Sequence, residues 1–249
     1  MLDSYLNQVI RRESRLYYLA VYRSGLGAPS AIGAYEVLIT VVAGGQVPPG
    51  EGQVVVLDFD GGSITLPPHE SYAVGPFDTA DISLSYAGMT ATVRDQINAT
   101  LLQNYEGLSL DVRDVPPDPL PVSVAYSTVL FGGRSPDAFG QSQDIDAFNS
   151  NHSDSSIVFT GMFTPARFGR VLSATELGTA IGNIAAHELG HLLGLNHVDN
   201  VNDVMDTSGG TLTLLGDMHF LTSPLDPMIA PIGTQDSFLL LLETLGAMQ

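Results

Sequence analysis

The segment from His187 to His197, HELGHLLGLNH, constrains this chain more than any other. His187 and His191 are spaced so that, on an α-helix, both imidazoles lie on one face and one turn apart. On an unbroken helix His197 would lie about 15 Å beyond His187, whereas bonds from zinc to imidazole nitrogen are only about 2.0–2.1 Å. The helix can end at Gly194, because glycine takes the left-handed conformation without a Cβ clash. The pattern therefore predicts a helix that stops there and a chain that returns His197 to the other two histidines.

Three neutral imidazoles would bind zinc and leave one coordination position open, the arrangement of a catalytic site and not of a closed structural one. Glu188 follows the first predicted ligand and is placed to take a proton from a water molecule at that position. The alternative is a buried helix whose histidines bind no metal. An HExxH pair alone is a weak signal, but Gly194 and His197 make the pattern much more specific, so zinc is favoured.

HELGHLLGLNH matches every fixed position of HExxHxxGxxH, and it thereby resembles the zinc signature of the metzincin clan of metallopeptidases. That clan also has a methionine turn beneath the metal, and Asp203-Val204-Met205-Asp206 follows here. The short gap between His197 and Met205 resembles the matrixin branch. Val198, after the third histidine, is typical of none of the best-known families, and Thr207 stands where astacins and serralysins have tyrosine. The resemblance implies that Met205 forms an apolar floor under the histidine rings.

The resemblance implies a zinc-dependent endopeptidase that cleaves protein or peptide substrates. His187, His191 and His197 would hold the metal, and Glu188 would act as general base and then general acid. Two alternatives come from other classes: a catalytically silent, zinc-bearing binding or adhesion module, and a zinc amidohydrolase acting on a non-protein amide. An intact Glu188 argues against the silent module. The sequence carries no signal for an oligomeric state.

The order of elements predicts an α+β fold, with a metzincin-like catalytic domain over residues 51–249. We expect a twisted mixed sheet, a backing helix, a zinc-binding helix begun by a capping box at Ser173 and Glu176, and a C-terminal helix capped by Ser237. In metzincins the strand just before the zinc helix is the sheet edge that lines the cleft, and a substrate peptide can pair with such an edge. The expected strands are Val54–Asp60, Leu108–Val115, Val122–Leu130 and the edge strand Ile157–Phe163, and the expected helices are Met89–Tyr105 and Asp236–Leu245.

Residues 1–50 are predicted to be an N-terminal extension that ends in a linker. A helix over Leu2–Val21 and a strand over Tyr35–Val42 are expected, followed by a run of glycine and proline at Gly44–Gly52 that opposes both helix and strand. One interpretation is a pro-segment that covers the active cleft. The other, which we favour, is a docking or structural extension.

Charge and composition exclude several classes of partner. The net charge is −18, with nine arginines and no lysine, so the chain will repel nucleic acid and anionic lipid headgroups. No run of about 18 apolar residues occurs, so no membrane insertion is expected. The absence of cysteine excludes disulfides and a cysteine that could block the zinc. Leu16–Tyr22 is too short and too closely flanked by arginine to be a signal peptide. Either an export signal has been removed or the protein stays inside the cell, and the resemblance favours a removed signal and a secreted protein.

An acidic loop before the last predicted strand offers oxygen ligands that would suit Ca²⁺. Its spacing is not that of an EF-hand, and a solvated acidic loop is the favoured interpretation. The acidic residues are Asp137, Asp144, Asp146 and Asp154.

Overall fold

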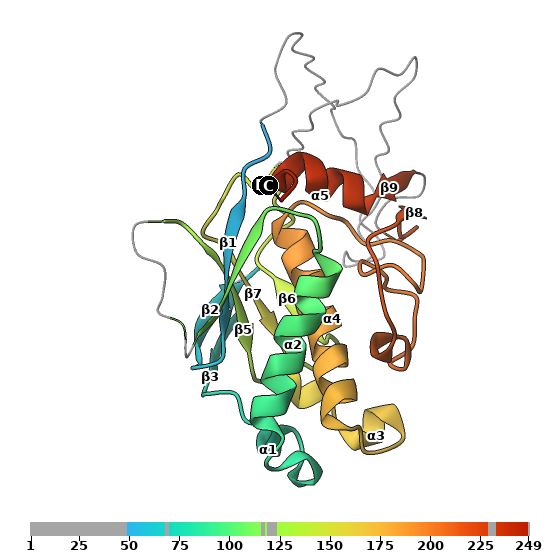
Figure 1. Ribbon diagram of the computed structural model, residues 1–249. Helices are drawn as coiled ribbons and strands as arrows, with labels where there is room; N and C mark the ends of the chain where they lie inside the picture. Colours follow the sequence, from blue (N-terminus) through green and yellow to red (C-terminus); the bar gives the residue numbers. More distant parts are fainter. Residues whose placement is uncertain (1–48, 68–69, 116–117, 119–123, 229–232, 249) are drawn as a thin grey trace, which may run out of the picture.

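The computed structural model describes residues 49–67, 70–115, 118, 124–228 and 233–248. Within them the chain forms a five-stranded mixed sheet with two long helices packed against it (Figure 1). The predicted α+β class and mixed sheet are confirmed. Among the described residues, no helix is long and apolar enough to cross a membrane.

The sheet has the strand order β4-β1-β5-β7-β6. The first four strands are parallel, and β6 pairs with β7 in the antiparallel direction at one edge. Side chains of β1, β5 and β7 make the centre of the core, because these inner strands are covered on both faces. The bounds are β1 Gln53–Asp58, β4 Leu110–Val115, β5 Ser127–Phe131, β6 Gly140–Ser142 and β7 Ser155–Val158.

The predicted edge strand at residues 157–163 is wrong. β7 ends at Val158 and lies inside the sheet, between β5 and β6, and η2 (Thr160–Met162) is a short 3-10 helix. The true edge is β6, whose three residues Gly-Gln-Ser are half-buried and show no apolar alternation. The continuous apolar run around Ile157 is instead typical of a strand buried on both faces.

The two long helices are α2 (Thr90–Asn104) and α4 (Ala174–Leu192), which lie side by side (Figure 1). Between them the Tyr105 hydroxyl donates to the Ala186 carbonyl at 3.0 Å, and the Asn104 amide donates to the Asn183 side-chain oxygen at 2.9 Å. These bonds hold α4 at a fixed position along α2. The predicted backing helix and zinc-binding helix are thus both present.

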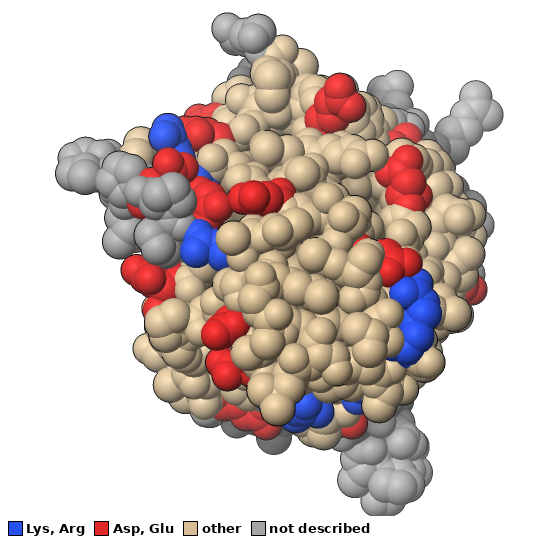
Figure 2. All heavy atoms as spheres, turned by 60° about the horizontal axis from the view of Figure 1, so that its bottom comes forward, with Lys and Arg blue, Asp and Glu red and all other residues tan. Residues whose placement is uncertain are grey.

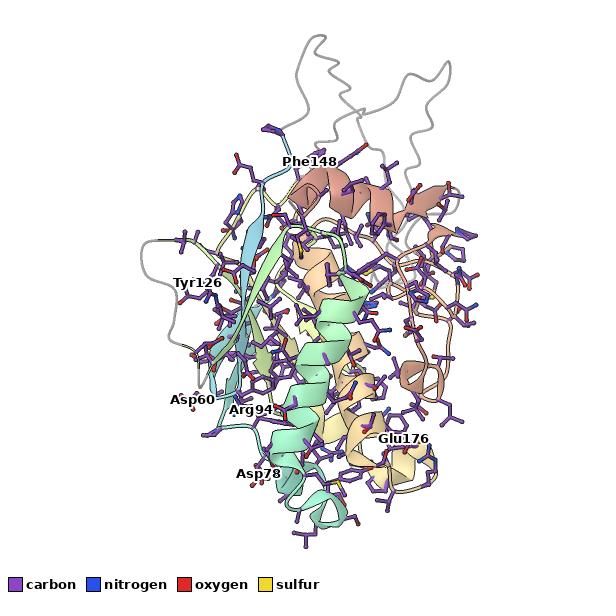
Figure 3. The ribbon with its side chains drawn as sticks, in the orientation of Figure 1. Asp60, Asp78, Arg94, Tyr126, Phe148 and Glu176 are labelled. Carbon is purple, nitrogen blue, oxygen red and sulfur yellow. The ribbon has the colours of Figure 1, made fainter. Side chains whose placement is uncertain are left out.

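The start of α4 confirms the predicted capping box. The Ser173 hydroxyl accepts from the Glu176 N–H at 3.2 Å, and the Glu176 carboxylate accepts from the Ser173 N–H at 2.9 Å. Figure 3 shows Glu176 at this end of α4, far from the loop that carries Phe148 at the other end. One apolar stripe of α4 is fully buried, and its residues are Leu177, Ile181, Ala185, Leu189 and Leu192.

Smaller elements complete the described chain. The hairpin of β2 (Gly62–Leu66) and β3 (Glu70–Val74) contacts the sheet through Tyr72, whose ring meets that of Phe159 at 4.9 Å. After the methionine turn, β8 and β9 form a small antiparallel pair. The remaining bounds are α1 Thr79–Ile82, η1 Leu84–Tyr86, α3 Pro165–Phe168, η3 Thr213–Leu215, β8 Thr222–Pro224, β9 Thr234–Asp236 and α5 Ser237–Leu245.

The predicted C-terminal helix is present as α5, but its cap is not Ser237. The Asp236 carboxylate accepts from the Leu239 N–H at 3.1 Å, and Ser237 is the first helical residue. The Ser237 hydroxyl instead accepts from the Gln235 amide at 3.1 Å. The helix and strand predicted within residues 1–48 lie outside the described residues, as does the start of the strand predicted at residues 122–130.

Candidate active site

The last two turns of α4 carry His187, Glu188 and His191, all three buried. His187 Nδ1 lies 2.8 Å from the Val204 carbonyl oxygen, and His191 Nδ1 lies 2.7 Å from the Leu195 carbonyl oxygen. A carbonyl has no proton to donate, so each ring donates from Nδ1, and a neutral ring then has a bare lone pair at Nε2. The protein backbone thus directs both Nε2 lone pairs to the same place.

Gly194 ends the helix as predicted. Its φ of +92° reverses the chain, and the Leu195 N–H then donates back to the Gly190 carbonyl at 2.9 Å. A Cβ at residue 194 would lie 3.0 Å from the Asp146 carbonyl oxygen, so a side chain is disfavoured both by the backbone conformation and by the neighbouring loop. This reversal brings His197 back to the histidines of α4.

Three histidine nitrogens converge at the end of α4. Nε2 of His197 is 2.9 Å from Nε2 of His191 and 3.1 Å from Nε2 of His187. Two of these atoms are bare lone pairs, and His197 could donate a proton to only one of them at a time. A cation with three nitrogen ligands satisfies all three, and imidazole nitrogen is a preferred ligand of Zn²⁺. The residues therefore fit the predicted metal, and these three form a group with the spacing of a metal site.

The environment keeps these histidines neutral, which is the form that binds a metal. Burial, aided by the nearby His197, lowers the pKa of His187 to about 4. Burial likewise lowers the pKa of His191 well below its ordinary value. The pKa of His197 is also lowered by burial, against the opposing effect of the Asp226 and Asp206 carboxylates.

Glu188 is next to His187 in sequence, and its side chain contacts the edge strand. Its Oε2 accepts from the Ser142 hydroxyl at 2.7 Å, and the same hydroxyl is 2.8 Å from the Glu188 carbonyl oxygen. A Cβ at Gly140 would lie only 2.5 Å from Glu188 Oε1, so the carboxylate occupies the space that a side chain on β6 would take. Burial raises the pKa of Glu188 to about 8, and the Ser142 hydrogen bond opposes this. A cation at the histidines would also lower that pKa, because positive charge favours the carboxylate.

The free edge of β6 adjoins Glu188. The Gln143 N–H donates to the Ser155 carbonyl and the Phe159 N–H donates to the Phe139 carbonyl, so residues 139, 141 and 143 face β7. In an antiparallel pair the alternate residues turn their backbone groups to the other side. Gly140 and Ser142 therefore present N–H and C=O groups to an added strand.

The methionine turn lies under the histidines. Met205 is fully buried, and a Cβ at Gly190 would lie 2.5 Å from its sulfur, so the turn packs tightly against α4. Asp203, which the sequence analysis did not single out, is also fully buried. Its carboxylate accepts from the Met205 N–H at 3.0 Å and from the Ser223 hydroxyl at 2.7 Å. Asp203 therefore holds the turn whose Val204 carbonyl orients His187.

The structure brings together five of the predicted residues, namely His187, Glu188, His191, His197 and Met205. The aspartates of the acidic loop do not converge in this way. Asp146 accepts from Ser150 and from the Asn151 N–H, and Asp154 accepts from Ser127 at 2.6 Å. Burial raises the pKa of Asp154 to about 6. Among the described residues these aspartates form no metal-binding group, so calcium is not supported.

A match to a protein-family model falls on this site. Residues 163–211 match the Peptidase_M10 family model, Matrixin. The match includes the three histidines, Glu188 and Met205, and it covers well under half of the chain. It confirms the predicted likeness to zinc metallopeptidases for this segment. A comparison with curated proteins finds no match.

Solved structures with a similar chain path share little sequence with this protein. An archaemetzincin from Methanopyrus kandleri has 14% identity and a TM-score of 0.43, over 80% of this chain and 99% of that chain. A zinc-dependent peptidase from Methanocorpusculum labreanum has 16% identity and a TM-score of 0.37, over 66% and 92%. A GM1-bound form of the ECX AB5 holotoxin has 11% identity and a TM-score of 0.38, over 78% and 80%.

Proposed function

We propose that this protein is a zinc-dependent endopeptidase of the metzincin type. The observation that carries the proposal is the convergence of three histidine nitrogens beside the buried carboxylate of Glu188, within a segment that matches the Matrixin model. His187, His191 and His197 would hold the metal. When bound, zinc would supply Lewis-acid polarisation of the scissile carbonyl and lower the pKa of water from about 15.7 toward 7.

The chain's own residues divide the remaining work. Glu188 takes a proton from the attacking water and passes it to the departing amine, acting first as base and then as acid. Ser142 holds the Glu188 carboxylate in one orientation, and Met205 supports the histidine rings from below. Gly140 and Ser142 bind the substrate backbone as an added strand, which gives affinity without a strict sequence requirement. Secretion, which the family resemblance implies, is part of the same proposal.

The decisive test is cleavage of a denatured protein by the zinc-loaded chain, with and without a chelator. We expect fragments that the chelator abolishes and that return on addition of Zn²⁺, because the chelator competes with the three histidines for the metal. Mass spectrometry of the fragments gives the bonds cut and detects self-cleavage near residues 44–53. A zinc-bound protein that cuts no peptide bond would contradict the proposal.

Ser142→Ala is expected to lower kcat by about tenfold while leaving KM and zinc affinity nearly unchanged. The hydroxyl makes a charge-assisted bond to the Glu188 carboxylate, and such bonds contribute about 1.5–3 kcal/mol, part of which water can replace. Ser142→Thr keeps the oxygen and should restore most of the rate. Loss of zinc in step with loss of activity would mean that Ser142 supports the fold instead of orienting Glu188.

A further inference from the structure

Two arginines stand out in this strongly acidic protein because they have no acidic partner among the described residues. Of the five arginines among the described residues, Arg94 pairs with Asp114 at 2.7 Å, Arg113 with Asp111 at 2.7 Å, and Arg170 with Glu176. Arg134 and Arg167 are exposed and form no ion pair within the part of the chain that the structure describes. Figure 2 shows how few basic side chains one face carries beside its acidic ones. With a net charge of −18, unpaired guanidinium groups are well suited to an anionic ligand.

Arg167 lies at the amino end of the edge strand. Its guanidinium is 5.5 Å from the centre of the Phe139 ring and donates to the Pro136 carbonyl at 3.4 Å. Phe139 immediately precedes β6. The backbone carbonyl of Arg167 accepts from the Thr211 hydroxyl at 3.2 Å, and Thr211 belongs to the segment that follows the methionine turn. Arg167 therefore links the segment that precedes β6 with the segment that follows the methionine turn.

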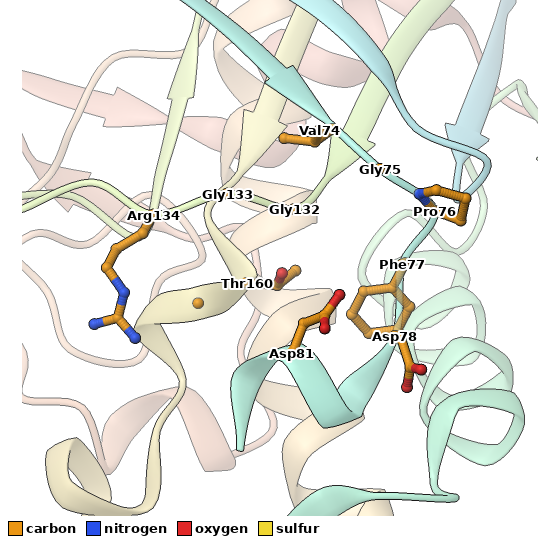
Figure 4. A pocket seen from close by; sticks show the side chains of 11 residues that line it. Val74, Gly75, Pro76, Phe77, Asp78, Asp81, Gly132, Gly133, Arg134 and Thr160 are labelled. Atoms are coloured by element: carbon orange, nitrogen blue, oxygen red, sulfur yellow. The ribbon is translucent and has the colours of Figure 1, made fainter. Parts of the chain in front are cut away.

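Arg134 lies in the turn after β5, two residues before Pro136, whose carbonyl accepts from Arg167. A Cβ at Gly161 would lie 3.4 Å from the Arg134 Cβ, so the base of this side chain rests on η2. Arg134 also lines a pocket of about 280 Å³ with Asp78 and Asp81. Figure 4 shows the guanidinium extending to the opposite side of η2 from Asp81, and Asp78 is already bound to the Ala80 N–H and the Thr90 hydroxyl. Within the described part of the chain, neither Asp78 nor Asp81 forms an ion pair with Arg134.

The direction of the edge strand decides which part of a substrate meets these arginines. Antiparallel pairing is the more stable arrangement per residue, so a bound peptide should run opposite to β6. Its carboxyl-terminal half then lies toward Phe139, on the side of Arg134 and Arg167. We propose that Arg167, assisted by Arg134, binds a substrate carboxylate on the carboxyl side of the scissile bond. This inference rests on the proposed peptidase function, and it makes acidic or carboxyl-terminal segments the preferred substrates.

Peptides of one parent sequence test the proposal. The first peptide carries glutamate two or three residues after the cut and has an amidated carboxyl end. The second has glutamine at that position and a free carboxyl end, and the third, neutral peptide has glutamine and an amidated end. The fourth has glutamate before the cut. We expect the first or the second peptide to have about fivefold higher kcat/KM than the neutral one, the range of a solvent-exposed ion pair, and this ratio should fall toward one in about 1 M salt. Preference for the first identifies a side-chain carboxylate, and preference for the second a chain terminus. A preference for glutamate before the cut would overturn the assignment.

Arg167→Gln and Arg134→Gln should each reduce the ratio of kcat/KM for the acidic peptide to kcat/KM for the neutral one. Arg167→Glu should reverse the preference, so that a peptide with lysine at the same position is cleaved faster than the acidic one. Arg113→Gln is the matched control, because Arg113 is also exposed but lies on β4, at the opposite edge of the sheet. It should leave the ratio unchanged. An unchanged ratio in folded Arg167→Gln and Arg134→Gln proteins would overturn the proposal.

Binding without turnover separates this subsite from the peptidase function. Fluorescence anisotropy of labelled peptides on zinc-loaded Glu188→Gln protein measures affinity when hydrolysis is blocked. Tighter binding of the acidic peptide supports the subsite even if the unmodified protein cleaves nothing, in which case only the peptidase function fails. Cleavage of neutral and acidic peptides at equal rates, with equal binding, overturns the subsite and leaves the peptidase function standing.

Discussion

Glu188→Gln is expected to bind zinc as tightly as the unmodified protein and to lose hydrolysis by about 10²–10⁴-fold in kcat, the range for removal of a general base. Glutamine has nearly the same shape, and its side-chain oxygen can still accept from the Ser142 hydroxyl. It cannot take a proton from water at neutral pH. The three histidines are untouched, so metal content measured by elemental analysis should stay at one zinc per chain while steady-state cleavage of a peptide collapses.

Glutamine is neutral at every pH, so the variant should be no less stable. Burial raises the pKa of Glu188, which means that the carboxylate is destabilised at this position relative to a neutral group. Glu106→Gln is the matched control, because Glu106 is exposed beyond the end of α2 and far from the site in sequence. That variant should keep full activity. A zinc-loaded Glu188→Gln protein that still cuts at an undiminished rate would remove Glu188 from the mechanism.

The parts of the fold that were predictable are those set by local chemistry. Ser173 and Glu176 satisfy each other's neighbouring N–H groups whatever the rest of the chain does, so the beginning of α4 could be located from four residues. Gly194 is equally local, since its positive φ is open to glycine and strained for other residues. Because the spacing of the histidines is fixed by the helix and this turn, the convergence of His187, His191 and His197 also followed from the sequence.

The edge strand could not be found in this way because its structure depends on distant partners. Gly140, Gln141 and Ser142 have no strand propensity of their own, and they form β6 only by pairing with β7 across a long polar loop. The sequence predicts the edge strand at the apolar run around Ile157 instead. Its lack of polar alternation was the available signal that β7 is an inner strand.

Residues that support the site were missed for the same reason. Ser142 contacts Glu188 from 46 positions away in the sequence, and Asp203 acts on His187 only through the backbone of the methionine turn. Neither Ser142 nor Asp203 stands at a sequence spacing from the histidines that would identify it as part of the site. For the acidic loop, a solvated loop was the favoured interpretation and a calcium site the alternative; Asp146 and Asp154 are instead buried and are engaged by Ser150, Asn151 and Ser127.

His191→Ala is expected to lose both zinc and hydrolysis. His191 supplies one of the three converging nitrogens and is itself held by the Leu195 carbonyl, so its removal leaves two ligands and an unpaired buried carbonyl. Loss even of an outer-shell partner weakens metal binding by about 10–100-fold, and loss of a direct ligand should exceed that. Titration with Zn²⁺ against a competing chelator measures the change.

Thermal unfolding gives an independent measurement of the loss of zinc binding in His191→Ala. A ligand that binds only the folded protein raises the free energy of unfolding by about 2.7 kcal/mol at 100 times its dissociation constant. Added zinc should therefore raise the melting temperature of the unmodified and the Glu188→Gln proteins, and have little effect on His191→Ala. His219→Ala is the matched control, because His219 is exposed and its backbone N–H and carbonyl, not its side chain, bond to Asn202 and Val204. If His191→Ala kept the full zinc-induced stabilisation, the metal would lie elsewhere, and the three converging nitrogens would need a different explanation.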